Sequence, residues 1–284
     1  MTNNTIKSVL KEAQEKLITV SDSPALDTEI LLSHCLEKNR TYLHTWPEHI
    51  VEAEPLACFQ SFLEKRLTDY PIAYLIGTKP FWSLDLIVTP DVLIPRPETE
   101  LLVETALDKI RQIKHPKILD LGTGSGAIAL ALASERPDAT IIATDVSTEA
   151  LQIAKKNADK YQLSGIVEFI KSDWFSQIID RDFDLIVSNP PYIAPNDPHL
   201  TQSIRYEPQQ ALIADSITSG NGMKDIQTII SQSQNYLKEN SYLMIEHGYQ
   251  QGSATQLLFK THCYSNNQII KDISGNDRLS IVQK

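Results

Sequence analysis

The chain has 284 residues, of which 42% are hydrophobic and 22% charged, a composition typical of a folded globular protein rather than a disordered or fibrous one. Its 26 Lys and Arg against 36 Asp and Glu give a formal net charge of −10, which argues against a protein that holds duplex nucleic acid over a broad basic surface. At roughly 150 residues per domain, this length predicts about two domains.

Cysteine usage and apolar runs indicate the compartment. Cys35, Cys58 and Cys263 are widely spaced and form no CxxC pair, which argues against a disulfide framework or a cysteine zinc site. The segment Met1–Lys7 has no apolar core of signal-peptide length, and no apolar run approaches the roughly 20 residues of a membrane helix. No histidines stand at H-x-x-x-H spacing. We therefore expect a soluble cytoplasmic protein without a metal site.

Residues 1–75 are predicted to form a small helical domain. Apolar side chains recur at helical spacing from Ile6 to Leu17, a second helix is expected to begin at Pro24, and a third at Pro55. The segment carries 7 basic and 11 acidic residues, a net charge of −4. Its acidic surface suggests a partner with basic patches.

A β-hairpin linker is predicted over residues 76–97. Apolar residues alternate with other residues from Leu84 to Val88, followed by a turn signal at Thr89–Asp91 and an apolar segment at Val92–Ile94. These features predict two short strands around a proline-containing turn, joining two domains.

Residues 98–284 are predicted to form an α/β domain, because apolar strands alternate with helices along this segment. Such strands are typical of a mostly parallel sheet that is covered by helices on both faces. The expected strands are Lys117–Leu121, Thr140–Asp145, Val167–Ile170, Phe183–Val187, Tyr242–Ile245, Gln268–Lys271 and Leu279–Val282.

A glycine-rich turn, Gly122-Thr123-Gly124-Ser125-Gly126, follows the first of these strands and precedes a helix. Glycines let the backbone turn tightly and let a ligand approach closely. A plain βα turn is one alternative and a dinucleotide site another, but the dinucleotide fingerprint places its third glycine where this chain has Ala127. The spacing here is G-x-G-x-G, and the acidic Asp120 precedes it on the strand, so the pattern favours an uncharged or cationic nucleoside over a pyrophosphate.

Asp145 ends the next strand, 19 residues after Gly126. A carboxylate at this position can accept hydrogen bonds from both ribose hydroxyls of a nucleoside. The alternative is an N-cap for the helix that begins near Thr148. Its place beside the glycine turn favours the ribose role.

The segment Asn189-Pro190-Pro191-Tyr192 follows a buried strand and should face the same crevice as the glycine turn. Two prolines fix the backbone and leave carbonyls free to accept hydrogen bonds, Asn189 adds an amide oxygen, and Tyr192 adds a ring face. Acceptors that hold both hydrogens of a planar –NH2 group would stabilise the positive charge that develops as its nitrogen attacks an electrophile. The alternative is a structural turn with Tyr192 as a core anchor.

The chain resembles the peptide chain release factor N5-glutamine methyltransferase family (the PrmC/HemK family). Besides the glycine turn, Asp145 and the Asn-Pro-Pro-Tyr segment, the resemblance rests on Pro71–Gly77, Phe81-Trp82, Leu93–Glu100, Arg205–Pro208, Glu246–Gly248 and Gly275–Arg278. It covers most of the chain beyond residue 65 and is weak before that.

The resemblance implies a Rossmann-like class I methyltransferase domain with a seven-stranded, mostly parallel sheet, a small N-terminal helical bundle and a hairpin linker. It implies transfer of a methyl group from S-adenosyl-L-methionine, which leaves S-adenosyl-L-homocysteine. The acceptor would be the side-chain amide nitrogen of the glutamine in the Gly-Gly-Gln motif of class I release factors, in support of translation termination. Neither stable nucleic-acid binding nor membrane association is expected.

The family's functional residues carry over by motif. The cofactor would be bound by Gly122, Thr123, Gly124, Ser125 and Gly126 at its methionine part, by Asp145 at the ribose, by Trp174 near the adenine, and by Asn189. The substrate glutamine would be held by Asn189, Pro190, Pro191 and Tyr192, of which Asn189, the Pro190 carbonyl and Tyr192 are the expected catalytic groups. An ordinary core tryptophan is the alternative for Trp174.

Some roles stay open. Arg96 either shapes the substrate mouth or forms a structural interdomain ion pair, and Glu207 is similarly open. The helical domain is expected to contact the protein substrate away from its glutamine loop.

Three other functions remain as alternatives. Methylation of DNA adenine N6 or cytosine N4 is disfavoured because both parts of the chain are acidic. A nucleotide-dependent oxidoreductase is disfavoured by Ala127. A non-catalytic cofactor-binding module would be expected to lack Asn189 or Tyr192, and both are present.

Overall fold

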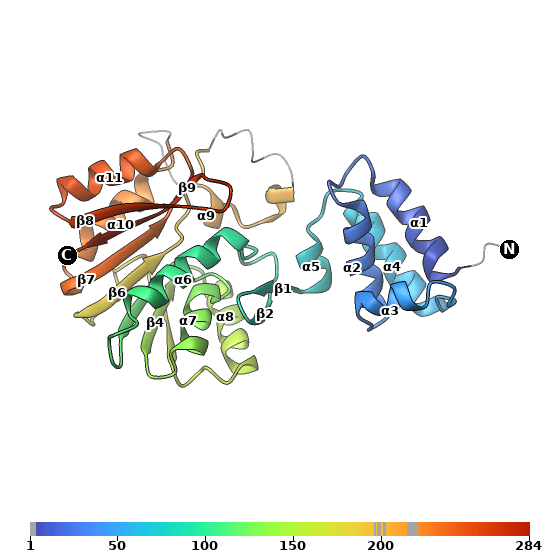
Figure 1. The fold of residues 1–284 in the computed structure, drawn as a ribbon, viewed down its shortest axis with the longest axis horizontal. Coiled ribbons are helices and arrows are strands. Elements are labelled where there is room, and N and C mark those ends of the chain that lie inside the picture. Colours follow the sequence, from blue (N-terminus) through green and yellow to red (C-terminus); the bar gives the residue numbers. More distant parts are fainter. Residues whose placement is uncertain (1–3, 196, 198–199, 201–202, 215–220) are drawn as a thin grey trace. The chain divides into compact units, whose positions relative to one another are not determined.

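A computed structural model describes residues 4–195, 197, 200, 203–214 and 221–284. These residues form two compact units (Figure 1). The helical unit comprises the described residues within 1–77 and 201–206, and the sheet unit those within 78–200 and 207–284. In this described part of the chain, no helix is long and apolar enough to span a membrane.

The helical unit packs its helices around one apolar core that includes Leu17, Leu31 and Phe59. Its helices are α1 (Ile6–Leu17), α2 (Pro24–Cys35), α3 (Arg40–Thr45), α4 (Ala53–Arg66), α5 (Ile72–Ile76) and the short 3₁₀ helix η3 (Ser203–Tyr206). The sequence predicted α1, α2 and α4, whose length allows an apolar stripe to repeat. Helices α3 and α5 have six and five residues, too few for a periodic pattern.

The helix η3 belongs to the helical unit although it lies far along the sequence from the other helices. The side chains of Arg205 and Tyr206 both donate hydrogen bonds to the Thr68 carbonyl, at 2.8 and 2.9 Å. The Tyr206 ring packs edge-on against Tyr70, with 4.9 Å between ring centroids. The segment between the two parts of the sheet unit is thus anchored at the end of α4.

The sheet unit contains a seven-stranded sheet in the order β5-β4-β3-β6-β7-β9-β8. Neighbours from β5 to β7 pair in parallel, and β9 pairs antiparallel with both β7 and β8. The strands are β3 (Lys117–Leu121), β4 (Thr140–Asp145), β5 (Val167–Lys171), β6 (Phe183–Ser188), β7 (Leu237–Glu246), β8 (Ser265–Lys271) and β9 (Asp277–Gln283). The predicted mostly parallel sheet is confirmed.

Helices cover both faces of this sheet. Alternating residues of β3 enter opposite cores: Ile118 joins one cluster and Leu119 the other. On the first face lie α6 (Glu100–Lys109), α7 (Ala127–Glu135) and α8 (Thr148–Lys160), and on the second α10 (Lys224–Ser233) and α11 (Gly252–Thr261). Burial on both faces explains why the strands read as continuous apolar runs.

The hairpin lies earlier in the chain than its predicted turn. Strands β1 (Thr78–Phe81) and β2 (Leu84–Ile87) pair antiparallel, and Trp82 turns the chain with φ of 54°. The predicted second strand at Val92–Ile94 was wrong. A turn does close from Thr89 to Val92, but the Ile94 N–H then donates to the Glu207 side chain at 3.0 Å instead of to a strand. The sequence pattern could not reveal this partner, which lies 113 residues away.

Within the sheet unit, the hairpin is held by the buried Asn157 of α8. Its amide exchanges two hydrogen bonds with the Ile87 backbone, at 2.7 and 3.0 Å, and donates a third to the Ser125 carbonyl at 2.9 Å. One side chain therefore joins the hairpin, α8 and the glycine-rich turn.

Candidate active site

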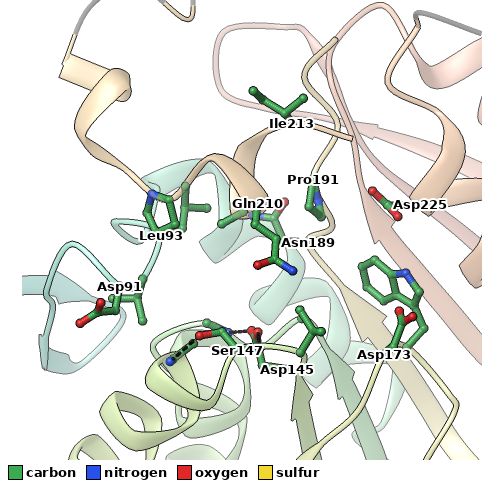
Figure 2. A pocket seen from close by; sticks show the side chains of 18 of the residues that line it. Asp91, Leu93, Asp145, Ser147, Asp173, Asn189, Pro191, Gln210, Ile213 and Asp225 are labelled. Carbon is green, nitrogen blue, oxygen red and sulfur yellow. Dashed lines mark hydrogen bonds between the residues drawn. The ribbon is translucent and has the colours of Figure 1, made fainter. Parts of the chain in front are cut away.

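A cavity of about 380 Å³ opens where β3, β4, β5 and β6 end (Figure 2). The carboxyl ends of parallel strands are where open α/β sheets bind ligands. The described residues that line the cavity are Asp91, Val92, Leu93, Gly122, Gly124, Asp145, Val146, Ser147, Ala150, Ser172, Asp173, Trp174, Asn189, Pro191, Pro208, Gln210, Ala211, Ile213 and Asp225.

The glycine-rich turn divides into residues that face the cavity and residues that pack behind it. Gly122 and Gly124 line the cavity with φ of 73° and 56°, a backbone that favours glycine. Gly126 has φ of 85°, and a Cβ there would lie 3.0 Å from the Leu130 side chain, so this glycine permits close packing. Thr123 and Ser125 are buried and absent from the cavity lining.

Asp145 faces the cavity with both carboxylate oxygens held in place. Oδ2 accepts from the Gly124 N–H and Oδ1 from the Ser147 N–H, both at 2.9 Å. Burial raises the pKa of Asp145, and these two donors oppose the rise. The N-cap of α8 is Ser147, whose hydroxyl accepts from Ala150 N, so the N-cap alternative for Asp145 is wrong. The Val146 N–H is a third backbone donor that opposes the rise, and the carboxylate keeps acceptor capacity for a ligand hydroxyl.

Asp120, the residue before Leu121 on β3, is a further candidate, which the sequence analysis used for its charge but did not assign to the site. Its carboxyl is fully buried, which raises its pKa to about 7. One oxygen accepts from the Thr123 hydroxyl at 2.6 Å, and the other has no hydrogen-bond partner among the described residues. A buried, half-satisfied carboxylate beside a glycine turn suits a cationic ligand. In the sequence, an acidic residue two positions before the first glycine of the turn was the signal that marked Asp120 as a candidate.

Trp174 forms part of the opposite wall. It follows β5 with φ of 47°, and a Cβ on Gly122 would lie 3.6 Å from its ring. Ser172, two residues earlier, holds this turn through a 2.7 Å hydrogen bond from its hydroxyl to the Trp174 carbonyl. The indole is only partly buried against the second core cluster, so it is not an ordinary core tryptophan.

The Asn-Pro-Pro-Tyr segment enters the cavity through Asn189 and Pro191, whereas Pro190 and Tyr192 are absent from its lining. Figure 2 shows the Asn189 amide between Pro191 and Asp145. Asn189 Nδ2 donates to Thr99 Oγ1 at 3.1 Å, which fixes the direction of the amide. Burial raises the pKa of the Tyr192 hydroxyl to about 12, so the phenol stays neutral.

The backbone after this segment is held by residues that the sequence analysis missed. Gln251 Nε2 donates to the Tyr192 carbonyl at 3.0 Å. Gly222 has φ of 69°, and a Cβ there would lie 2.2 Å from the same carbonyl oxygen, so only glycine fits. Neither residue lies near Tyr192 in the sequence, and no local pattern marks them.

Part of the cavity wall comes from the short helix α9 (Gln209–Leu212), which contributes Gln210 and Ala211. It is tied to the Asn-Pro-Pro-Tyr segment, because Ile193 N–H donates to the Leu212 carbonyl at 3.0 Å. Leu93 and its neighbours form another part of the wall from the segment predicted as a strand. A four-residue helix and an extended segment carry no periodic signal.

Arg96 and Glu207 form an ion pair within the sheet unit, and neither lines the cavity. Glu207 is 4% exposed, and its second oxygen accepts from the Ile94 N–H at 3.0 Å. The pair therefore fastens the segments that carry the cavity residues Leu93 and Pro208. The interdomain alternative for Arg96 is wrong, because both partners belong to one unit.

Comparison with known protein families identifies both parts of the chain. Residues 97–216 match the model of the methyltransferase small domain, and residues 8–77 match that of the PrmC N-terminal domain. Within the residues that the structure describes, no three His, Cys, Asp or Glu side chains are placed to hold a metal ion.

Two solved structures share the fold at low sequence identity. The hMettl16 catalytic domain in complex with MAT2A 3′UTR hairpin 6 matches with a TM-score of 0.56 and 17% identity, over 71% of this chain and 75% of that one. A methyltransferase from Pyrococcus furiosus matches with a TM-score of 0.52 and 16% identity, over 79% and 98%. These similarities establish the Rossmann-like methyltransferase fold.

Relatives of much higher identity span nearly the whole chain. The release factor glutamine methyltransferase of Aliivibrio fischeri is 47% identical over 98% of this chain and 97% of its own length. The protein of the same name from Vibrio cholerae is 45% identical over 98% and 96%, and that from Escherichia coli 44% over 96% of each chain. The chain therefore belongs to the release factor glutamine methyltransferase family.

Proposed function

We propose that this protein transfers the methyl group of S-adenosyl-L-methionine to the side-chain amide nitrogen of the glutamine in the Gly-Gly-Gln motif of class I peptide chain release factors. The observation that carries the proposal is the Asn189 amide, which lines a nucleoside-sized cavity with its Nδ2 engaged by Thr99. Relatives at 44–47% identity that are named for this activity support it.

The cavity residues fit the proposed cofactor. Asp145 has lone pairs for the two ribose hydroxyls, and Trp174 offers a ring face for the adenine. Asp120 does not line the cavity, but its buried carboxyl oxygen, which has no hydrogen-bond partner among the described residues, lies beside the glycine turn and suits the ammonium group of the methionine part. Gly122 and Gly124 leave room for the amino-acid end of the cofactor. When bound, the cofactor supplies an electrophilic methyl group on a sulfonium.

The acceptor amide would be held by two oxygens of the Asn-Pro-Pro-Tyr segment. Because Asn189 Nδ2 is engaged by Thr99, Asn189 Oδ1 is the atom that can accept one N–H of the substrate amide. The Pro190 carbonyl accepts the other N–H, and Pro191 fixes its direction. These acceptors draw electron density onto the nitrogen and stabilise the positive charge that it gains as it attacks. The excess proton then leaves the nitrogen, and S-adenosyl-L-homocysteine remains.

Tyr192 would pack its ring against the planar amide. Its backbone carbonyl is held by Gln251 Nε2 at 3.0 Å, and burial keeps its hydroxyl neutral, with a pKa raised to about 12. Its ring packs against the second core cluster and does not line the cavity. In the proposed complex the ring would restrict rotation of the glutamine side chain and exclude water from the reacting nitrogen.

We further propose that the helical unit binds the release factor outside its Gly-Gly-Gln loop. The match of residues 8–77 to the PrmC N-terminal domain and the net charge of −4 on residues 1–75 support a separate recognition role. Large apolar side chains on its surface, Trp46 and Ile50 among them, offer contact area.

Replacing Asp145 by Ala should weaken S-adenosyl-L-methionine binding. Lost charge-assisted hydrogen bonds cost about 1–3 kcal/mol, or about 5- to 150-fold in Kd. Calorimetric titration of the full chain measures this loss. The matched control is Asp159→Ala, an exposed aspartate of α8 outside the cavity lining, which should bind as wild type. Equal affinity of the Asp145 and Asp159 variants would refute the ribose role.

Replacing Asn189 by Ala should lower kcat for a Gly-Gly-Gln peptide by about 10²–10³-fold, the usual loss when one preorganised electrostatic contact is removed. Cofactor affinity should change little, because Asp145 and the glycine turn are intact. Single-turnover methyl transfer with saturating cofactor separates the two effects. A normal transfer rate in this variant would remove Asn189 from the catalytic groups.

Binding of a whole release factor in the presence of S-adenosyl-L-homocysteine should slow amide hydrogen exchange in α1–α4, whereas a short Gly-Gly-Gln peptide should not. Hydrogen-exchange mass spectrometry on the full chain makes this comparison. If the two ligands at saturation leave α1–α4 with the same exchange, the helical unit has no recognition role.

A further inference from the structure

Two buried side chains lie directly behind Asn189. Because Ser188 of β6 pairs with Ile245 of β7, the next residues, Asn189 and Glu246, leave neighbouring strands at the same level. Glu246 is 1% exposed, and one of its oxygens, Oε2, has no hydrogen-bond partner among the described residues. Thr99, at the end of the 3₁₀ helix η1 (Pro97–Thr99), is 4% exposed and lies close to the side chains of both Asn189 and Glu246.

The Thr99 hydroxyl interacts with residues at the ends of β6 and β7 and does not cap its own helix. Thr99 is the N-cap residue of α6, a position where threonine usually accepts a hydrogen bond from the first turn, yet its side chain makes no such bond. Its oxygen instead accepts from Asn189 Nδ2 at 3.1 Å, and the Thr99 side chain is close enough to the Glu246 carboxyl to lower the pKa of that carboxyl.

From this arrangement we propose that Glu246 and Thr99 are positioning residues that set the direction of the Asn189 amide, so that Oδ1 rather than Nδ2 faces the substrate. The proposal rests on the proposed function, because it assigns the order of hydrogen bonds behind the group that accepts the glutamine amide. Both residues act through Asn189 and touch neither substrate.

The direction of the Asn189 amide follows from the number of hydrogens that Thr99 and Glu246 can donate. A hydroxyl carries one hydrogen, and an ionised carboxylate carries none, so the Thr99 hydrogen must point to Glu246. The Thr99 oxygen is then left to accept, and only the Nδ2 side of Asn189 can donate to it. With the Asn189 amide reversed, Thr99 would have to donate to Oδ1, and the buried Glu246 charge would lose its donor, which is costly.

Protonation of Glu246 removes this constraint. Burial raises the pKa of Glu246 to about 7, opposed by the Thr99 hydrogen bond and by the positive charge of Arg278. Glu98 raises this pKa and Arg96 lowers it, and the neutral Tyr192 is the other titratable group that faces the carboxyl. A protonated Glu246 can itself donate to Thr99, which frees Thr99 to donate to Asn189 and admits the reversed amide. At saturating cofactor, kcat should therefore fall as the pH drops through about 7.

The test compares four full-length variants in single-turnover methyl transfer to a Gly-Gly-Gln peptide. Thr99→Val and Glu246→Gln should lower the rate constant by about 10–100-fold, the range seen when a group that orients a reactive ligand is lost. Thr99→Ser keeps the hydroxyl and should restore most of the rate. Thr105→Val is the matched control. Among the described residues, that hydroxyl of α6 donates to the Leu101 carbonyl of its own helix, at 2.7 Å, and to no other group, so its rate should equal that of wild type.

Two readouts separate positioning from a general loss of structure. The decline of kcat below about pH 7 should be present in wild type and Thr99→Ser and absent in Thr99→Val and Glu246→Gln. Asp120 also has a pKa raised to about 7, but its titration acts on cofactor affinity and persists in every variant. The double variant Thr99→Val/Glu246→Gln should be no slower than the slower single variant, because both act through one amide.

The outcomes also separate this proposal from the proposed function. If wild type methylates the peptide and Asn189→Ala does not, while Thr99→Val retains the wild-type rate and pH profile, the positioning role is overturned and the function stands. If wild type itself transfers no methyl group to the peptide or to a whole release factor, the proposed function fails. If Thr99→Ser is as slow as Thr99→Val although both bind the cofactor as wild type does, the hydroxyl is not the group that acts, and the positioning role is again overturned.

Discussion

The parallel pairing of β3, β4, β6 and β7 is the constraint on which the site depends. Leu121 lies beside Thr144 on one side and Ser188 on the other, and Ser188 lies beside Ile245. The residues that follow therefore reach one edge of the sheet together: Gly122, Asp145, Asn189 and Glu246. A shift of register by one residue would turn these side chains to the opposite face.

The residues at this edge of the sheet could be predicted from the sequence because the signals that mark them are local. Each strand is a continuous apolar run with a polar or glycine residue at its end, so the positions of Asp145 and Asn189 could be predicted. Thr99 and Glu207 could not, since their partners lie 90 and 111–113 residues away and only the folded chain brings them together. The hairpin was misplaced for a related reason: Ile94 finds a side-chain partner where a strand was expected.

The fold of the sheet unit does not by itself determine which substrate is methylated. The same sheet architecture occurs in structures of 16–17% identity, one of them in complex with a 3′UTR hairpin, so the fold alone does not select a substrate. We propose that selection comes from the groups that meet an –NH2, above all the Asn189 amide, whose direction Thr99 and Glu246 would set. A net charge of −10 suits a protein acceptor better than a nucleic acid with its negatively charged phosphodiester backbone.

The most direct test of the account is peptide mass spectrometry of a recombinant class I release factor after incubation with S-adenosyl-L-methionine and this protein. The account predicts the mass of one added methyl group on the Gly-Gly-Gln glutamine, lost when Asn189→Ala replaces the wild type. An unmodified glutamine, with methyl transfer to DNA or RNA in a parallel reaction, would contradict the proposed acceptor and leave only the methyltransferase fold standing.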